Sequence, residues 1–182
     1  MHSWEYPPRV VGGLGQHVAD LLPAQGEMGL DVHLLTPRLA GGLAVETIAG
    51  VTIHRVDPVM PGEDIYTQAW QTNMRLEEEA ARLWEEAGGF DVIHAHDWLV
   101  AFAGWSLKHT FRAPLVATIH ATERGRGRGE LYGPTSRIIN EVEWRLTYEA
   151  WRVICCTEYM ATEAQSYFGA PADKIDVAPN GV

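Results

Sequence analysis

The sequence predicts an α/β fold with three layers, in which helices cover both faces of a mostly parallel sheet. Short apolar runs rich in β-branched residues alternate with longer segments whose apolar residues recur every three or four positions. Strands that are separated by helices need right-handed crossovers, which place the helices over the faces of a parallel sheet. Because 182 residues suffice for one such domain, we expect a single domain spanning residues 1–182.

The first half of the chain is expected to supply three strands and two helices. The strands are predicted at 32–36, 44–48 and 51–56, and the helices at 14–28 and 65–87. Ala49 and Gly50 separate the second and third strands, which favours a β-hairpin. Pro23 should kink or shorten the first helix, because proline cannot donate a backbone hydrogen bond. Gly88 and Gly89 should end the second helix.

The second half repeats the alternation more regularly. Strands are predicted at 92–95, 114–119, 153–156 and 175–177, and helices at 98–109, 138–151 and 158–168. Three apolar residues of the middle helix, Ile139, Val142 and Leu146, fall on one face and should point inward. The glycine-rich stretch 125–133 predicts a flexible loop.

Composition excludes several classes of protein. With 24 acidic and 14 basic residues the formal net charge is −10, which argues against a nucleic-acid or anionic-membrane binder. No apolar run approaches the ~20 residues of a membrane span, and the N-terminus lacks a signal-peptide pattern. Cys155 and Cys156 are adjacent in a predicted strand and should point to opposite faces as buried free thiols. These features fit a reducing cytoplasm.

Parallel sheets bind ligands outside the carboxyl ends of their strands, so we searched the segments at those ends. The turn at 6–15 opens the first predicted helix, and the amides of Gly12, Gly13 and Leu14 could bind an anion or sugar hydroxyls there. A tight turn without a ligand is the alternative. The spacing is not a dinucleotide fingerprint, because Val18 stands where the third glycine would be.

The sequence HAHDW at 94–98 follows the next strand. His94 and His96 should share one face of it, which makes a metal site conceivable. Because no acid or cysteine cluster with ligand spacing accompanies them, we expect no metal. Asp97 falls at the predicted helix N-cap, where its carboxylate would accept backbone N–H bonds. It either has this structural role alone or also binds a ligand hydroxyl.

Two further segments follow strands. His120 comes directly after the strand at 114–119, where it is either a ligand-binding residue or a structural histidine. The alternating Arg-Gly stretch at 124–129 resembles short RNA-binding tracts, but in an acidic chain a solvated loop or a lid over a ligand is favoured. The last segment, 178–182, is a turn that contains Asn180.

These segments together resemble the N-terminal domain of a GT-B-fold glycosyltransferase, a Rossmann-like half. The similar group includes glycogen and starch synthases and related group 1 transferases. The matching sequences are SWEYPP at 3–8, GGLG at 12–15, HAHDW at 94–98, TIH at 118–120 and VAPNGV at 177–182. They occur in the family's order and span nearly the whole chain, so the ordered set carries the resemblance.

The resemblance implies transfer of a hexosyl unit, glucosyl from ADP- or UDP-glucose, to a glycan acceptor with retention at the anomeric carbon. The nucleotide sugar is a substrate, and no further cofactor is implied. Catalysis is implied for His120, which would bind the transferred sugar. The residues implied at the acceptor side and cleft are Asp97, Trp98 and Asn180, and those near the donor phosphates and sugar are Gly12, Gly13, Leu14 and Arg9.

The sequence departs from the family pattern in three places. Val10 stands where bacterial glycogen synthases have a lysine, with Arg9 displaced by one position. The family's first strand is longer than the start at Met1 allows, so the start is expected to be truncated. The C-terminal domain, which holds most of the nucleotide in this family, is expected to be missing.

Because half of the cleft would be missing, the isolated chain is expected to be inactive. Three alternatives remain open: a stand-alone saccharide-binding module, a transferase with a lipid or small-sugar acceptor, and a Rossmann oxidoreductase. The oxidoreductase is disfavoured because Thr36 and Pro37 stand where a ribose-binding acid would follow the strand.

Overall fold

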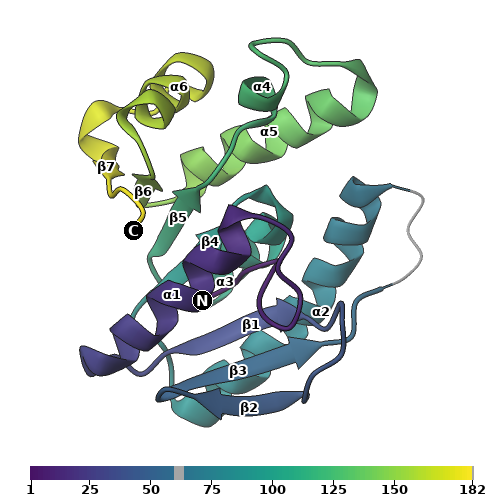
Figure 1. Cartoon of the computed structure of the whole chain (residues 1–182), viewed down its shortest axis with the longest axis vertical. Helices are drawn as coiled ribbons and strands as arrows, with labels where there is room; N and C mark the ends of the chain where they lie inside the picture. Colours follow the sequence, from purple (N-terminus) through teal and green to yellow (C-terminus); the bar gives the residue numbers. More distant parts are fainter. Residues whose placement is uncertain (60–63, 182) are drawn as a thin grey trace. The chain divides into compact units, whose positions relative to one another are not determined.

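The computed structural model describes residues 1–59 and 64–181. These residues form two compact units, Met1–Phe90 and Asp91–Val182, and each is treated by itself below (Figure 1). The α/β class is confirmed: one unit has a mixed sheet and the other a fully parallel sheet, and both sheets are packed with helices.

The first unit is built on a three-stranded sheet with the order β1-β3-β2. Its strands are β1 (His33–Pro37), β2 (Val45–Ile48) and β3 (Val51–Val56), and its helices are α1 (Gly13–Glu27) and α2 (Ile65–Ala87). β1 and β3 are parallel, and β2 and β3 form the expected antiparallel hairpin. Ala49 and Gly50 have φ of 50° and 81°, which is the left-handed geometry that a two-residue hairpin turn requires.

The chain start adds a short extended segment beside β1. The N–H of Ser3 donates to the carbonyl of Leu35 at 3.1 Å, and the N–H of Leu35 donates to the carbonyl of Met1 at 2.8 Å. The bridge between His2 and Leu35 is parallel. The segment, α1 and β1 therefore form a strand–helix–strand unit, with the glycine turn at its strand-to-helix junction.

Side chains along β1 and β3 alternate between the two faces of this sheet, and a different helix packs on each face. Leu34 and Ile53 pack with Val18 and Leu22 of α1 in the buried core. The neighbouring residues point the other way: His54 lies 3.5 Å from Glu79 of α2. The two faces of the sheet are therefore covered by different helices.

The second unit has a four-stranded sheet in the order β4-β5-β6-β7, and every neighbouring pair is parallel. The strands are β4 (Ile93–His96), β5 (Leu115–Ile119), β6 (Arg152–Cys155) and β7 (Ile175–Val177). The helices are η1 (Trp98–Val100), α3 (Ala101–Phe111), α4 (Glu123–Arg126), α5 (Gly133–Glu149), α6 (Glu158–Phe168) and η2 (Ala172–Lys174). Strand order follows chain order, so all four carboxyl ends lie along one edge.

Most predicted elements are confirmed, and α2, α6 and β7 have the predicted bounds. Both α2 ends are locally encoded, because the Asp64 side chain accepts from the Thr67 N–H and Gly88 adopts φ 77°. The inward positions of Ile139, Val142 and Leu146 are also confirmed, since all three are buried.

Three local predictions were wrong. α1 is not shortened at Pro23 and continues to Glu27, because a proline in the last turns of a helix removes only one hydrogen bond; a kink there stays a prediction. Part of the expected loop is the short helix α4, which the Thr122 hydroxyl caps by accepting the Gly125 N–H at 2.8 Å. α5 starts five residues before the predicted 138, because Pro134 suits a first helical turn.

Two expectations from composition concern the cysteines and the apolar character of the helices. Cys155 and Cys156 are both free and buried, as expected. Among residues 1–59 and 64–181, no helix combines the length and the apolar character needed to span a membrane.

Candidate functional site

The carboxyl edge of the four-stranded sheet carries the polar residues of the second unit. Asp97 follows β4, His120 follows β5 and Cys156 follows β6. The segment that contains Asn180 follows β7, and its Ala178 N–H donates to the Cys155 carbonyl at 2.9 Å. Four chain segments that are far apart in sequence thus end along one edge, as the fold class predicts.

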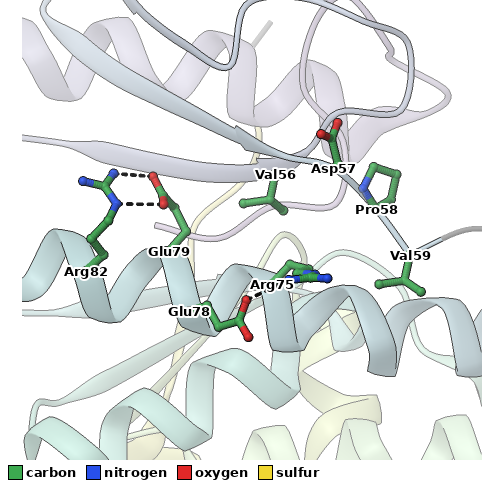
Figure 2. Close-up of a pocket in the computed structure, with 8 residues that line it drawn as sticks. All are labelled: Val56, Asp57, Pro58, Val59, Arg75, Glu78, Glu79 and Arg82. Atoms are coloured by element: carbon green, nitrogen blue, oxygen red, sulfur yellow. Dashed lines mark hydrogen bonds and ion pairs between the residues drawn. The ribbon is translucent and has the colours of Figure 1, made fainter.

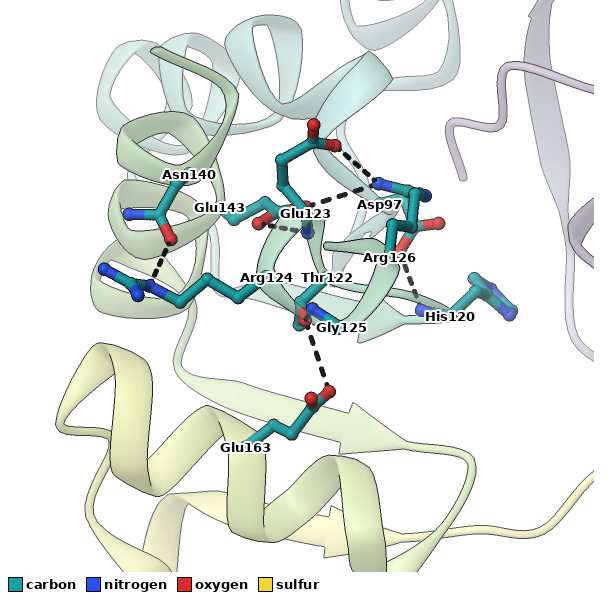
Figure 3. Close-up of polar contacts among 10 residues, drawn as sticks. All are labelled: Asp97, His120, Thr122, Glu123, Arg124, Gly125, Arg126, Asn140, Glu143 and Glu163. Carbon is teal, nitrogen blue, oxygen red and sulfur yellow. Dashed lines mark hydrogen bonds and ion pairs between the residues drawn. The ribbon is translucent and has the colours of Figure 1, made fainter. Parts of the chain in front are cut away.

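Asp97 joins two of these segments. Its carboxylate accepts the backbone N–H of His120 at 2.7 Å (Figure 3). Asp97 is the N-cap of η1, as expected, but its side chain makes no capping bond to that helix. The residue is 5% exposed and has φ 61° and ψ 175°, a region that costs a residue with a side chain about 1–3 kcal/mol. This backbone turn directs the carboxylate to the end of the neighbouring strand.

The His120 ring is held by two protein groups. Its Nε2 lies 3.0 Å from Nδ1 of His96, and its Nδ1 lies 3.7 Å from Sγ of Cys156. Burial raises the pKa of Cys156, so the thiol keeps its proton and can donate to the ring. A ligand hydroxyl that bonds to either ring nitrogen would therefore replace or share one of these partners.

The histidines of β4 extend this polar row. The rings of His94 and His96 lie 4.3 Å apart, which confirms that they share one face of the strand. His94 Nε2 lies 2.7 Å from the hydroxyl of Thr118 on β5. The rings of His96 and His120 stack at 5.3 Å with an interplanar angle of 22°. The edge therefore presents a hydrogen-bonded row of imidazoles, and the expectation of no metal stays a prediction.

Two buried glutamates lie behind the segment that follows His120 (Figure 3). Glu143 of α5 accepts the backbone N–H of Glu123, with its two oxygens 2.8 and 2.9 Å from that nitrogen. Glu163 of α6 accepts the Thr122 hydroxyl at 3.2 Å. Sequence reasoning missed both residues, although an acid on the apolar stripe of a helix is a signal, because burying an unpartnered carboxylate is unfavourable.

Two other expected site residues differ in exposure. Trp98 is 4% exposed and forms the first residue of η1, so its indole belongs to the core of the unit. Asn180 is exposed in the segment after β7. Arg124 and Arg126 of the Arg-Gly stretch have protein partners: Asn140 lies 3.2 Å from Arg124, and Glu123 lies 3.2 Å from Arg126.

The first unit carries the glycine turn. Gly12 is the N-cap of α1, and the carboxylate of Glu5 accepts the N–H of Val11 at 2.9 Å and of Gly12 at 3.2 Å. The amides of Gly13 and Leu14 lie in the first turn of α1, where no intrahelical acceptor exists.

No contact of the described chain requires glycine at positions 12 and 13. A Cβ added at Gly12 or Gly13 would meet no atom of the described chain within 4 Å, and neither residue has a positive φ. By contrast, a Cβ at Gly26 of the same helix would lie 2.7 Å from the Ala49 carbonyl. The open backbone at Gly12 and Gly13 therefore leaves room for a ligand.

Arg9 and its neighbours form the turn ahead of this helix. Arg9 is exposed, and its N–H donates to the Tyr6 carbonyl at 3.1 Å. The buried guanidinium of Arg55 donates to the carbonyls of Pro7 at 2.7 Å and Leu43 at 3.1 Å. Arg55 thus anchors the turn to the loop before β2.

A hollow of about 670 Å³ lies between the end of β3 and α2 (Figure 2). Its lining residues are Val56, Asp57, Pro58, Val59, Arg75, Glu78, Glu79 and Arg82. Arg82 donates to Glu79 at 2.6 Å, and Arg75 donates to Glu78 at 3.2 Å. Hydrogen bonds from Arg82 hold the pKa of Glu79 below its usual value. The two arginines are thus paired with two glutamates along α2, and Asp57 leaves the lining with one more acidic than basic residue.

Comparison with known proteins decides the family. Residues 11–182 match Glycosyltransferase Family 4. The chain belongs to this family. An uncharacterized glycosyltransferase of Methanocaldococcus jannaschii is 38% identical over the whole chain and 45% of its own length. A glycogen synthase of Mycobacterium tuberculosis is 36% identical over the whole chain and 47% of its own length.

A third relative has a different printed activity. A D-inositol 3-phosphate glycosyltransferase of Pseudarthrobacter chlorophenolicus is 32% identical over 94% of the chain and 42% of its own length. The chain thus spans less than half the length of each of these relatives.

A solved structure confirms the fold assignment. The sucrose-phosphate synthase of Thermosynechococcus elongatus superposes with a TM-score of 0.77 at 18% identity, over 98% of this chain and 45% of that one. This likeness shows the Rossmann-like α/β fold of GT-B glycosyltransferases.

Proposed function

We propose that this chain is the acceptor-side, N-terminal half of a retaining hexosyltransferase that moves a glucosyl unit from ADP- or UDP-glucose to a glycan acceptor. Membership of glycosyltransferase family 4 and the 36% identity to a glycogen synthase support the assignment. In this proposal a C-terminal half binds most of the nucleotide, and the isolated chain is inactive.

The observation that carries the proposal is the open backbone at Gly12 and Gly13. The two residues start a helix of 15 residues, and neither fills space nor adopts a conformation that only glycine allows. The start of a helix presents backbone N–H groups and the positive end of the helix dipole. A diphosphate leaving group suits that position, because its oxygens can come within hydrogen-bond distance only where no side chain intervenes.

The carboxyl edge of the second unit supplies the sugar-binding groups in this proposal. Asp97 fixes the backbone of His120, and His120 would contact the hydroxyls of the transferred sugar. A glycosyl transition state develops positive charge on the ring while negative charge develops on the leaving diphosphate. Fixed amides and oriented hydroxyl contacts stabilise such a separation of charge without reorganising.

The test is a transfer assay on the complete transferase that contains this chain. We expect glucose transfer from ADP-glucose or UDP-glucose to maltooligosaccharides, and much slower transfer in Gly13→Ala. The isolated chain should give no transfer with either donor. Ordinary turnover by the isolated chain would refute the half-enzyme proposal, and full activity of Gly13→Ala would remove the role of the glycine turn.

The acceptor has one specific competitor. The 32% identity to D-inositol 3-phosphate glycosyltransferases favours a phosphorylated cyclitol as the alternative acceptor. Both acceptors should be offered in the same assay, with the donor held constant. Transfer to inositol phosphate but not to maltooligosaccharides would replace the glycan proposal and leave the transferase proposal intact.

A further inference from the structure

Glu143 is a buried carboxyl in the middle of α5, on the stripe that also holds Ile139, Val142 and Leu146. It is 1% exposed, so no bulk water solvates it. A carboxyl group replaces an apolar side chain on such a stripe at a substantial cost in desolvation. The contacts of this side chain show what offsets that cost.

The main contact of Glu143 is with the chain segment after β5. Both of its oxygens approach the Glu123 N–H, at 2.8 and 2.9 Å (Figure 3). Asp97 accepts the N–H of His120, three residues earlier, at 2.7 Å. With Glu163, which accepts the Thr122 hydroxyl, three buried carboxyl groups therefore hold residues 120–126, which we call the His120 segment.

The charged groups around Glu143 come from two neighbouring elements. Arg126 of α4 lies 3.8 Å from it, Glu123 belongs to the same short helix, and Asp97 stands between β4 and η1. On α5 itself Asn140 bonds to Arg124, and Thr147 donates to the Glu143 carbonyl. Burial outweighs the arginine and the backbone hydrogen bond, so the pKa of Glu143 rises to about 8.

We infer that Glu143 is a positioning residue of the transferase site: by accepting the Glu123 N–H it fixes the His120 segment, and through it the backbone that carries His120. In this inference Glu143 does not contact the ligand. The inference rests on the proposed function only where it concerns the effect of Glu143 on turnover. Its effect on the segment is a property of this chain alone.

The first experiment is NMR on the isotope-labelled chain, with Glu143→Gln, Glu143→Ala and the exposed Glu141→Gln as a control on the same helix. In the wild type and Glu141→Gln, the chemical shift of the Glu123 amide should follow the titration of Glu143 between roughly pH 6 and 10. In Glu143→Gln the amide should keep its hydrogen bond and lose the titration. In Glu143→Ala, amide exchange at Glu123 should accelerate by at least about tenfold.

Two results would overturn the inference. One is an unchanged Glu123 amide in Glu143→Ala, and the other is a titration that persists in Glu143→Gln. If Glu143→Ala does not fold, the comparison of wild type with Glu143→Gln decides alone, because the amide side chain keeps the size and one acceptor oxygen.

The second experiment measures turnover in the complete transferase. Glu143→Ala should lower kcat by about tenfold to 100-fold with a smaller change in KM, and Glu143→Gln should recover most of it. Because Glu143 titrates near pH 8, turnover of the wild type should change near that pH, and this change should disappear in Glu143→Gln. Equal losses in the Gln and Ala variants would contradict positioning. Absence of transfer in the wild type would refute the proposed function, while the NMR result would still decide the role of Glu143.

Discussion

The glycine turn of the first unit and the carboxyl edge of the second unit offer a ligand different kinds of group. At the glycine turn the candidate groups are the backbone amides of Gly13 and Leu14 at an exposed helix start, beside the Gly12 amide that Glu5 already accepts. At the carboxyl edge they are side chains, and buried carboxyl groups hold the backbone that carries them. The glycine turn depends on the lack of side chains at Gly12 and Gly13, whereas the carboxyl edge depends on hydrogen bonds between elements far apart in sequence.

This difference has a consequence for mutation. A substitution at the glycine turn adds atoms where a ligand would bind and leaves the fold intact. A substitution at the carboxyl edge removes a hydrogen bond that the fold itself uses. Activity and stability should therefore separate in the first region and change together in the second.

The largest difference between the effect on activity and the effect on stability is expected at the glycine turn. Gly12→Ala and Gly13→Ala should lower kcat of the complete transferase by about 100-fold, because a methyl group would keep a diphosphate from the amides. Thermal unfolding of Gly13→Ala should be unchanged or slightly later, since alanine is no worse than glycine in a helix.

Gly26→Ala is the matched control on the same helix. Its methyl group would lie 2.7 Å from the Ala49 carbonyl, so it should destabilise the chain by about 1–3 kcal/mol. Early unfolding of Gly13→Ala would break the comparison between the two regions.

The next effect is expected at His120. His120→Ala should reduce turnover of the complete transferase by about 100-fold, because the transferred sugar would lose its oriented contact. The exposed His109, 2.9 Å from Glu149 on the surface, is a control whose replacement by alanine should leave turnover within about twofold. Unchanged turnover in His120→Ala, measured with saturating donor, would make His120 a structural histidine.

A smaller effect is expected at Asp97. Asp97→Ala should lower the free energy of unfolding by about 1–3 kcal/mol, because the His120 N–H would lose its buried acceptor. Asp97→Asn keeps an acceptor oxygen, so urea titration should place it between the wild type and the alanine variant. A stable Asp97→Ala would mean that release of the strain at φ 61° offsets the lost bond.

The last effect is the pH dependence of stability at Glu143. Its pKa rises from 4.5 to about 8 on folding, so the folded state holds the proton more tightly than the unfolded state. The stabilisation is complete below about pH 4.5 and is lost as pH rises to about 8. Glu143→Gln does not titrate, so its thermal midpoint should exceed that of the wild type by an amount that grows from pH 5 to pH 8. A constant difference would contradict the raised pKa.

Elements with local end signals could be predicted from the sequence. α2 has its predicted bounds because Asp64 and Gly88 terminate it through contacts with their own neighbours. The order of strands and helices also follows from periodicity, and it places Asp97 and His120 at one edge. Their proximity could therefore be expected before any contact was known.

Contacts between distant segments could not be predicted in the same way. The partner of the Asp97 carboxylate depends on the positive φ of Asp97, which no neighbouring residue encodes. The bond from Glu123 to Glu143 joins α4, half of which was expected to be loop, to a helix turn 20 residues later. Glu5 satisfies the Gly12 amide, a role that appears only when the turn at 6–15 closes.

The adjacent thiols at the end of β6 allow unfolding of the second unit to be followed by alkylation. Burial raises the pKa of Cys155 to about 11, so at pH 8 only roughly one molecule in a thousand carries its thiolate, the form that reacts with alkylating reagents. Both cysteines of the chain belong to this unit. Alkylation kinetics followed by mass spectrometry should therefore count opening events of the second unit alone, whatever the first unit does.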